Sequence, residues 1–247
     1  MTNTNVGNAS NSYNNNTTII VGVNEESLRI QSWLSPLEPY RRHQDVRNRR
    51  LDGVGDWVLQ RNEFESWCES QDSPVNPTLL CYGGQGVGKT YISSLVIDTL
   101  REKARGQNIA VLPLYCDYQA RKDQLAVNLI GGLLKQVALG ATRIPGEIQS
   151  AFEESQQEGG QSLRLPDMVK LFVKVIRPIE RVYICVDAVD ELLPGDRSGF
   201  LRALQKIIQD APNTRLFITG RPYIRGELDK HLAKGAHVIH IVADRGD

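Results

Sequence analysis

The sequence predicts a three-layer α/β fold, in which a mostly parallel five-stranded sheet lies between two layers of helices. Apolar, strand-like runs alternate with stretches of helical spacing from residue 78 to residue 242. Such alternation is typical of a parallel sheet covered on both faces. A glycine-rich loop follows the first of these strands, and an acidic motif follows the third. The inferred strand order is 5-1-4-3-2.

Residues 1–24 are predicted to form a disordered, asparagine-rich tail. Asparagine stands at positions 3, 5, 8, 11, 14, 15 and 16 among serine, threonine and glycine. Such a stretch buries too little apolar surface to fold alone. It ends in residues 17–23, an uncharged, β-prone run of the kind that can add to a cross-β stack. Two interpretations therefore stay open, a solvated tail and a self-assembling, amyloid-like segment.

Residues 25–50 are predicted to form a helical and basic linker. Residues 25–33 show helical spacing, and Pro36 and Pro39 are expected to end that helix. Residues 41–50 contain five arginines. The default interpretation of this run is a solvated helix face or a linker, and the alternative is a patch that binds nucleic acid or lipid.

Residues 51–247 are predicted to form the α/β domain. Residues 51–77 form an entry segment that leads to the first strand, which begins at residue 78. Apolar residues 91–100 repeat at helical spacing after the loop, and Gly131 and Gly132 are a weak point in a later helix. The further strands are expected at 109–118, 181–187, 215–219 and 236–242, and the further helices at about 125–137, 167–176, 198–209 and 223–232. Residues 147–163 are expected to form a surface helix and loop.

The glycine-rich loop fits the pattern G-x-x-x-x-G-K-[ST] of a phosphate-binding P-loop. Phosphate oxygens need several converging backbone N–H donors, which glycines allow because they lack a Cβ. The following helix directs the positive end of its dipole at the same anion. Lys89 is expected to reach the phosphates, and the Thr90 hydroxyl is expected to bind Mg²⁺. The predicted nucleotide-binding residues of this loop are Gly83, Gly84, Gln85, Gly86, Val87, Gly88, Lys89, Thr90 and Tyr91.

The ends of two later strands supply the second half of the predicted site. Asp187 ends an apolar strand and is expected to hold Mg²⁺ opposite Thr90. Asp190 and Glu191 are both candidates for positioning the attacking water, and the sequence does not choose between them. Arg221 follows the next strand, where it is either a reader of the terminal phosphate or a surface arginine that caps a loop.

Composition narrows the class of protein. Lys and Arg balance Asp and Glu at 29 each, which argues against nucleic acid as a mainly electrostatic partner. The four cysteines show no C-x-x-C spacing, and reduced core thiols are expected. No stretch resembles a membrane span or a signal peptide. A cytoplasmic protein is therefore expected.

Three stretches together resemble the NACHT branch of the STAND signal-transduction NTPases: residues 83–90, 184–191 and 219–221. The resemblance covers about residues 51–242. Residues 53–59, and 115–118 with Gln124, are similar to the nephrocystin-type N-terminal NACHT domains found in filamentous fungi. In that family the first of these stretches lies near the base and ribose, so Val54 and Gly55 become base-site candidates. The family's arginine at the position of Arg221 senses the γ-phosphate.

The resemblance implies a signalling switch that binds ATP or GTP with Mg²⁺, rests with ADP or GDP, hydrolyses slowly and self-associates. It also implies a downstream effector reached through the N-terminal tail. Family members continue into a winged-helix module and repeats, whereas this sequence stops at Asp247, before them. Two alternatives remain: a non-catalytic, truncated assembly module, and a P-loop kinase that phosphorylates a small molecule.

Overall fold

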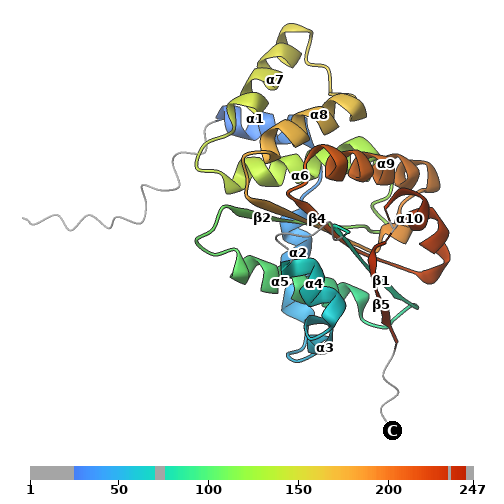
Figure 1. Cartoon of the computed structure of the whole chain (residues 1–247). Helices are drawn as coiled ribbons and strands as arrows, with labels where there is room; N and C mark the ends of the chain where they lie inside the picture. Colours follow the sequence, from blue (N-terminus) through green and yellow to red (C-terminus); the bar gives the residue numbers. More distant parts are fainter. Residues whose placement is uncertain (1–24, 70–75, 233–234, 243–247) are drawn as a thin grey trace, which may run out of the picture.

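A computed structural model describes residues 25–69, 76–232 and 235–242 of the chain. The predicted tail and its β-prone run lie outside the described residues. Figure 1 shows a central sheet with helices on both of its faces, which confirms the predicted three-layer α/β architecture.

The five strands form one sheet in the order β2-β3-β4-β1-β5, and every pairing is parallel. This is the order predicted from the sequence, counted from the other edge. All residues of β1 are buried, as expected for a strand covered on both faces. The strands are β1 (Thr78–Gly83), β2 (Ile109–Tyr115), β3 (Arg181–Asp187), β4 (Thr214–Gly220) and β5 (His237–Ile241).

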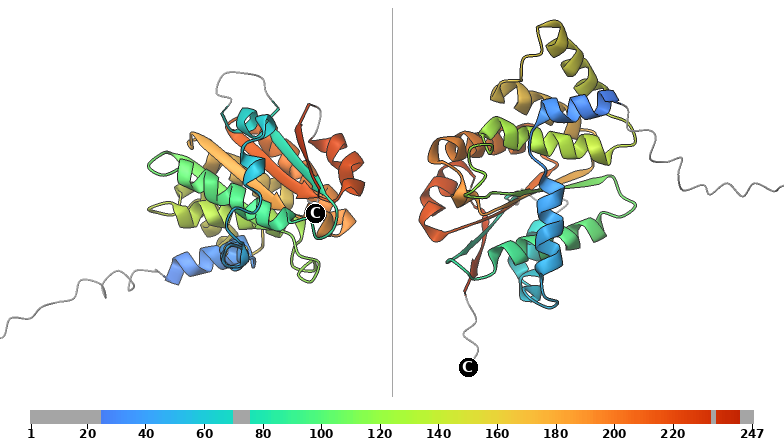
Figure 2. Two further views of the ribbon diagram at one scale, coloured as in Figure 1. Left: turned by 90° about the horizontal axis from the view of Figure 1, so that it is seen from below. Right: turned by 180° about the vertical axis from the view of Figure 1, so that it is seen from behind.

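The helices divide into two layers, and each layer covers its own apolar cluster (Figures 1 and 2). Side chains alternate across the strands, so Leu80 and Tyr82 face one cluster while Leu79 and Cys81 face the other. One layer holds α1 (Glu25–Leu34), α6 (Ala126–Gly140), α7 (Gly146–Gln157), α8 (Leu165–Ile176), α9 (Pro194–Asp210) and α10 (Arg225–His231), and the other holds α2 (Pro39–Arg49), α3 (Asp56–Leu59), α4 (Asn62–Glu69) and α5 (Lys89–Lys103). Two short 3₁₀ turns, η1 (Val189–Glu191) and η2 (Pro222–Ile224), follow β3 and β4.

The segment predicted to be a linker packs against the rest of the domain. Ile30 and Leu34 of α1 are buried in the cluster beneath α6, and Val46 of α2 is buried in the cluster beneath α5. Pro39 does not end a helix but begins α2, where its missing N–H costs nothing. In the views of Figure 2, α2 runs past the β2 edge of the sheet and joins the two layers. The domain boundary at residue 51 stays a prediction.

The glycine pair predicted to weaken a helix lies inside α6, which continues through it without a break. A Cβ on Gly131 would overlap the backbone carbonyl oxygen of Leu34. Glycine is therefore needed here because the end of α1 approaches the backbone of α6 closely.

The four cysteines are free and buried, as the sequence predicts. Burial raises the pKa of the thiols of Cys81, Cys116 and Cys185, so these groups stay protonated core side chains. Within the described ranges, none of the helices has the length and apolar character that crossing a bilayer requires.

Candidate nucleotide-binding site

The P-loop connects the end of β1 to the start of α5, as the motif predicts. Gly86 and Gly88 adopt positive φ angles of 77° and 86°, which favour glycine. At Gly83 a Cβ would lie 2.6 Å from a methyl carbon of Val87, so crowding excludes a larger residue there. A Cβ on Gly84 would meet only an ordinary contact, 3.9 Å from Val87. Backbone conformation thus favours glycine at two of the four loop positions, and crowding requires it at a third.

Lys89 begins α5 and folds back along the loop. Its Nζ donates hydrogen bonds to the carbonyl oxygens of Gly83 and Gly84, at 2.9 and 2.5 Å. Burial lowers the pKa of Lys89, while the carboxylates of Asp190 and Asp187 oppose that shift. The ammonium group therefore lies at the loop, within reach of an anion bound there.

Asp187 ends β3 and is 2% exposed. Its Oδ2 accepts a hydrogen bond from the Thr90 hydroxyl at 2.8 Å. Its Oδ1 accepts one from Ser93 at 2.6 Å and one from Thr219 at 2.7 Å. Three hydroxyl donors thus satisfy this buried carboxylate.

Ser93 and Thr219 were not predicted from the sequence. Ser93 stands one turn after Thr90, on the same face of α5. This spacing was the signal in the sequence that Ser93 could reach the same carboxylate as Thr90. Thr219 lies at the end of β4 and also accepts a hydrogen bond at 2.9 Å from the backbone N–H of Ala188. Ala188 itself has a φ of 54°, a left-handed conformation that directs the chain into η1.

Thr90 and Asp187, predicted to share a metal ion, therefore lie in direct contact. A hydroxyl and a carboxylate are hard oxygen ligands and fit Mg²⁺. In the part of the chain that the structure describes, no group of three or more His, Cys, Asp or Glu residues could hold a metal ion. A site with two protein oxygens fits the way Mg²⁺ is usually bound, by one or two protein ligands together with phosphate and water.

Asp190 and Arg221 form an ion pair across two strand ends. Arg221 Nε lies 3.3 Å from Asp190 Oδ2, and the Arg221 backbone N–H donates to Asp190 Oδ1 at 3.1 Å. Gly220 makes room for this arrangement, because a Cβ there would lie 2.6 Å from Ile224 Cδ1 and 3.5 Å from Asp190 Oδ1. Both oxygens of Asp190 are thus engaged by Arg221.

Glu191 is held by the loop after β2 and not by Arg221. Its Oε2 accepts a hydrogen bond from the backbone N–H of Tyr118 at 2.9 Å. Burial raises the pKa of Glu191, and the neighbouring carboxylates of Asp190, Asp117 and Asp187 raise it further. Asp190 and Glu191 are adjacent in sequence but have different surroundings.

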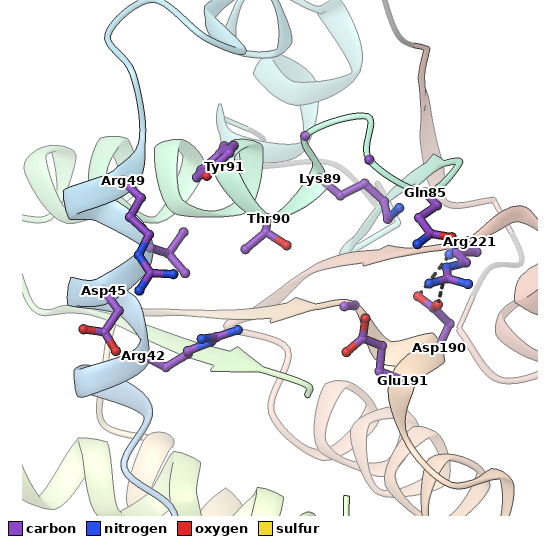
Figure 3. Close-up of a pocket in the computed structure, with 14 residues that line it drawn as sticks. Arg42, Asp45, Arg49, Gln85, Lys89, Thr90, Tyr91, Asp190, Glu191 and Arg221 are labelled. Carbon is purple, nitrogen blue, oxygen red and sulfur yellow. Dashed lines mark hydrogen bonds and ion pairs between the residues drawn. The ribbon is translucent and has the colours of Figure 1, made fainter. Parts of the chain in front are cut away.

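The P-loop, the acidic motif and α2 enclose a cleft of about 410 Å³ (Figure 3). Of the predicted residues of the P-loop and the acidic motif, Gly83, Gly84, Val87 and Asp187 do not line this cleft. The lining consists of Arg42, Asp45, Val46, Arg49, Gln85, Gly86, Gly88, Lys89, Thr90, Tyr91, Ala188, Asp190, Glu191 and Arg221.

Val54 and Gly55 do not line this cleft. Val54 is 42% exposed. Gly55 has a φ of 92° and packs against α5, where a Cβ would lie 2.9 Å from Ile92 Cγ1. That Val54 and Gly55 contact the base of the nucleotide stays a prediction.

The four α2 residues of the lining were not predicted to bind nucleotide. They belong to the run of five arginines, which was interpreted as a solvated helix face or linker. The basic run itself was the signal in the sequence that could have indicated them.

The chain was compared with proteins of known structure. It is similar to the ORC1 protein of Aeropyrum pernix in complex with DNA, with 18% identity and a TM-score of 0.48 over 88% of this chain and 50% of that one. It is similar to the Walker-type ATPase PABY2304 of Pyrococcus abyssi, with 16% identity and a TM-score of 0.49 over 78% of this chain and 55% of that one. Its similarity to AMPPCP-bound DnaA from Aquifex aeolicus has 14% identity and a TM-score of 0.41, over 81% and 49% of the two chains. The chain thus spans about half the length of these proteins, and the similarities are too remote to indicate function.

No curated protein matches the chain. The profile of the family described as Nephrocystin 3, N-terminal matches residues 53–221, which is more than half of the 247 residues. The match begins before the P-loop and ends at Arg221, so it contains the whole predicted phosphate and metal site. The chain therefore belongs to the nephrocystin 3 N-terminal family of NACHT-type P-loop NTPases.

Proposed function

We propose that the chain is a nucleotide-dependent signalling switch, which binds a nucleoside triphosphate with Mg²⁺, hydrolyses it slowly and self-associates in one nucleotide state. The observation that carries the proposal is the direct contact of Thr90 with Asp187, at 2.8 Å, beside a cleft of about 410 Å³. The base, adenine or guanine, stays open. Self-association and signalling rest on the resemblance to STAND NTPases.

The phosphates would lie on the P-loop at the start of α5. Lys89 would exchange its bonds to two loop carbonyls for bonds to phosphate oxygens. The backbone N–H groups of the loop and the positive end of the α5 dipole would hold the same anion. Thr90 and Asp187 would hold Mg²⁺, which neutralises phosphate charge during transfer.

The surroundings of the two acidic residues favour Glu191 as the group that positions the attacking water. Among the residues that the structure describes, only the Tyr118 amide engages Glu191, through one carboxylate oxygen. Burial raises the pKa of the Glu191 carboxyl, which suits a proton acceptor. Asp190 is occupied by Arg221 and would instead position that arginine.

The ion pair with Asp190 supports a role for Arg221 in distinguishing a bound triphosphate from a diphosphate. A terminal phosphate in the cleft would compete with Asp190 for the guanidinium group. Two alternative partners for one arginine form a two-state element, which nucleotide can bias. The predicted effector contact through residues 1–24 involves residues outside those that the structure describes.

The proposal is tested by purifying the chain, denaturing it in acid and identifying any released nucleotide by chromatography. Loss of one charge-assisted phosphate contact costs about 1.5–3 kcal/mol, so Lys89→Ala should weaken nucleotide affinity about tenfold or more. Lys174→Ala is the matched control, because Lys174 is exposed on α8, away from the cleft. Nucleotide binding by Lys89→Ala as tight as in the wild type would refute the site.

Self-association is tested by light scattering with a diphosphate and with a non-hydrolysable triphosphate analogue. The proposal expects a larger mass in one of the two states. Equal masses across a wide range of protein concentration would contradict the switch. Nucleotide consumption that depends on a small-molecule acceptor would indicate the kinase alternative instead.

A further inference from the structure

One wall of the cleft belongs neither to the P-loop nor to the acidic motif. It is formed by α2, which presents Arg42, Asp45, Val46 and Arg49 to the cleft. Figure 3 shows Arg42, Asp45 and Arg49 across the cleft from Lys89 and Arg221. The two arginines add positive charge to a cleft whose expected ligand is an anion. The inference below rests on the proposed function, since it concerns the same nucleotide.

An adjacent face of α2 anchors the helix. His43, 2% exposed, contacts Tyr115 Oη at 2.8 Å through Nδ1 and Asp98 Oδ1 at 3.1 Å through Nε2. Arg50, just after α2, lies 2.9 Å from Asp98 and donates to Ser94 Oγ at 2.9 Å. Because these contacts reach both β2 and α5, the cleft-facing side of α2 is held in place before a ligand binds.

Helix geometry sets the separation of the two arginines. Arg42 and Arg49 stand seven residues apart, which is two turns and roughly 10 Å along the axis. Both therefore lie on one face of α2, with Asp45 and Val46 between them. The wall thus carries one guanidinium group at each of its ends.

Arg42 lies at the acidic-motif end of the wall. Its Nη2 is 3.6 Å from Asp117 Oδ2, and its side chain is 48% exposed, so this pair is loose. Asp117 directly precedes Tyr118, whose amide holds Glu191. The acidic-motif end is also where a terminal phosphate would be attacked.

Arg49 lies at the other end of the wall, toward Tyr91 and the first turns of α5. Its neighbour Arg50 contacts Ser94, in the second turn of α5. Arg49 forms no ion pair with any residue that the structure describes, whereas Arg47 and Arg50 on either side of it both pair with Asp98. A cation without an ionic partner, lining a cleft built for an anion, has a nucleotide as its natural counter-ion.

We propose that α2 forms the second wall of the nucleotide site, with Arg42 binding the terminal phosphate and Arg49 binding nearer the nucleoside. Arg42 exchanges Asp117 for the γ-phosphate when a triphosphate binds. Arg49 contacts parts that di- and triphosphates share. Residues 39–49 are therefore part of the binding site and not a solvated linker.

The test measures dissociation constants of the full chain for a diphosphate and for a non-hydrolysable triphosphate analogue, both with Mg²⁺, by titration calorimetry. The variants are Arg42→Ala, Arg49→Ala and Lys89→Ala, with Arg41→Ala as the matched control. Arg41 is exposed on the same helix, does not line the cleft, and loses the same charge. Arg42→Lys keeps the charge and separates loss of charge from misfolding, and thermal unfolding is recorded for every variant.

Arg42→Ala should weaken triphosphate binding about fivefold or more while diphosphate binding stays close to that of Arg41→Ala. Arg49→Ala should weaken the binding of triphosphate and diphosphate by similar factors. Arg42→Lys should recover part of the triphosphate affinity that Arg42→Ala loses. If both arginine variants bind like Arg41→Ala while Lys89→Ala loses binding, this inference is wrong and the proposed function stands. If Lys89→Ala also binds normally, the proposed function fails. Equal losses of both nucleotides in Arg42→Ala would overturn the assignment of Arg42 to the terminal phosphate.

Discussion

Replacement of Thr219 by valine removes one hydroxyl from the hydrogen bonds around Asp187, with little change in side-chain volume. That hydroxyl donates to Asp187 Oδ1 at 2.7 Å and accepts from the Ala188 N–H at 2.9 Å. Thr219 is fully buried, so water would not replace either bond. Thr219→Val therefore isolates the energetic value of this contact.

The expected loss follows from the two bonds. A hydrogen bond to a charged group contributes about 1.5–3 kcal/mol, and leaving the buried Ala188 N–H without a partner costs about 1–3 kcal/mol. The added methyl group returns about 0.8 kcal/mol through burial. The net loss in the free energy of unfolding should be about 2–5 kcal/mol. For a loss of about 3 kcal/mol, the melting temperature of a domain this size falls roughly 6–12 °C.

The same strand provides the control. Thr214 is also fully buried in β4, and its Oγ1 has no hydrogen-bond partner among the described residues. Thr214→Val should therefore be neutral or stabilising, because it removes a buried, unpaired hydroxyl. Urea unfolding and calorimetry of both variants compare the two sites. If Thr219→Val costs no more than Thr214→Val, the Asp187 network does not stabilise the fold as we reason.

Three further predictions follow from the fold and the site. Gly131→Ala should lower the free energy of unfolding by about 2 kcal/mol or more, because the new Cβ would overlap the backbone of Leu34. Gly140→Ala in the same helix places its Cβ in open space and should be neutral or stabilising. Urea unfolding measures both variants. Burial is the main reason why the pKa of His43 lies below its usual 6.5, so the folded state favours the neutral ring. The contribution of His43 to stability is therefore present above pH 6.5 and is lost as the pH falls. The wild type should accordingly exceed His43→Gln in free energy of unfolding at pH 7.5, and by less at pH 5.5. Glu191→Gln should lower turnover of the bound triphosphate about a hundredfold or more while binding is retained, as measured by single-turnover hydrolysis.

Each of these expectations can fail in its own way. Equal stability of the two glycine variants would show that α1 does not approach α6 closely. A pH-independent difference between wild type and His43→Gln would mean that this ring does not titrate in that range. Unchanged hydrolysis by Glu191→Gln would return the water-positioning role to Asp190.

Much of the site was predictable because its chemistry is local in sequence. The P-loop pattern places Lys89 and Thr90 on the first turn of α5, since their positions depend on a few neighbouring dihedral angles. Asp187 and Arg221 were predictable because the carboxyl ends of parallel strands meet at one edge of the sheet. The layers followed from the alternation of strands and helices, and the strand order was inferred together with the P-loop fold.

Tertiary structure alone decided the rest. The sequence left Asp190 and Glu191 equivalent, and only packing gives one of them Arg221 and the other the Tyr118 amide. Thr219 lies 32 residues from the carboxylate it serves, a separation that no local pattern encodes. Arg42 and Arg49 are exposed, as a solvated helix face would be, and only the packing of α2 against the domain shows that they also line the cleft. By itself the sequence determined the strand edge where phosphate and metal would bind, whereas long-range contacts decided which side chains surround that edge and what each of them holds.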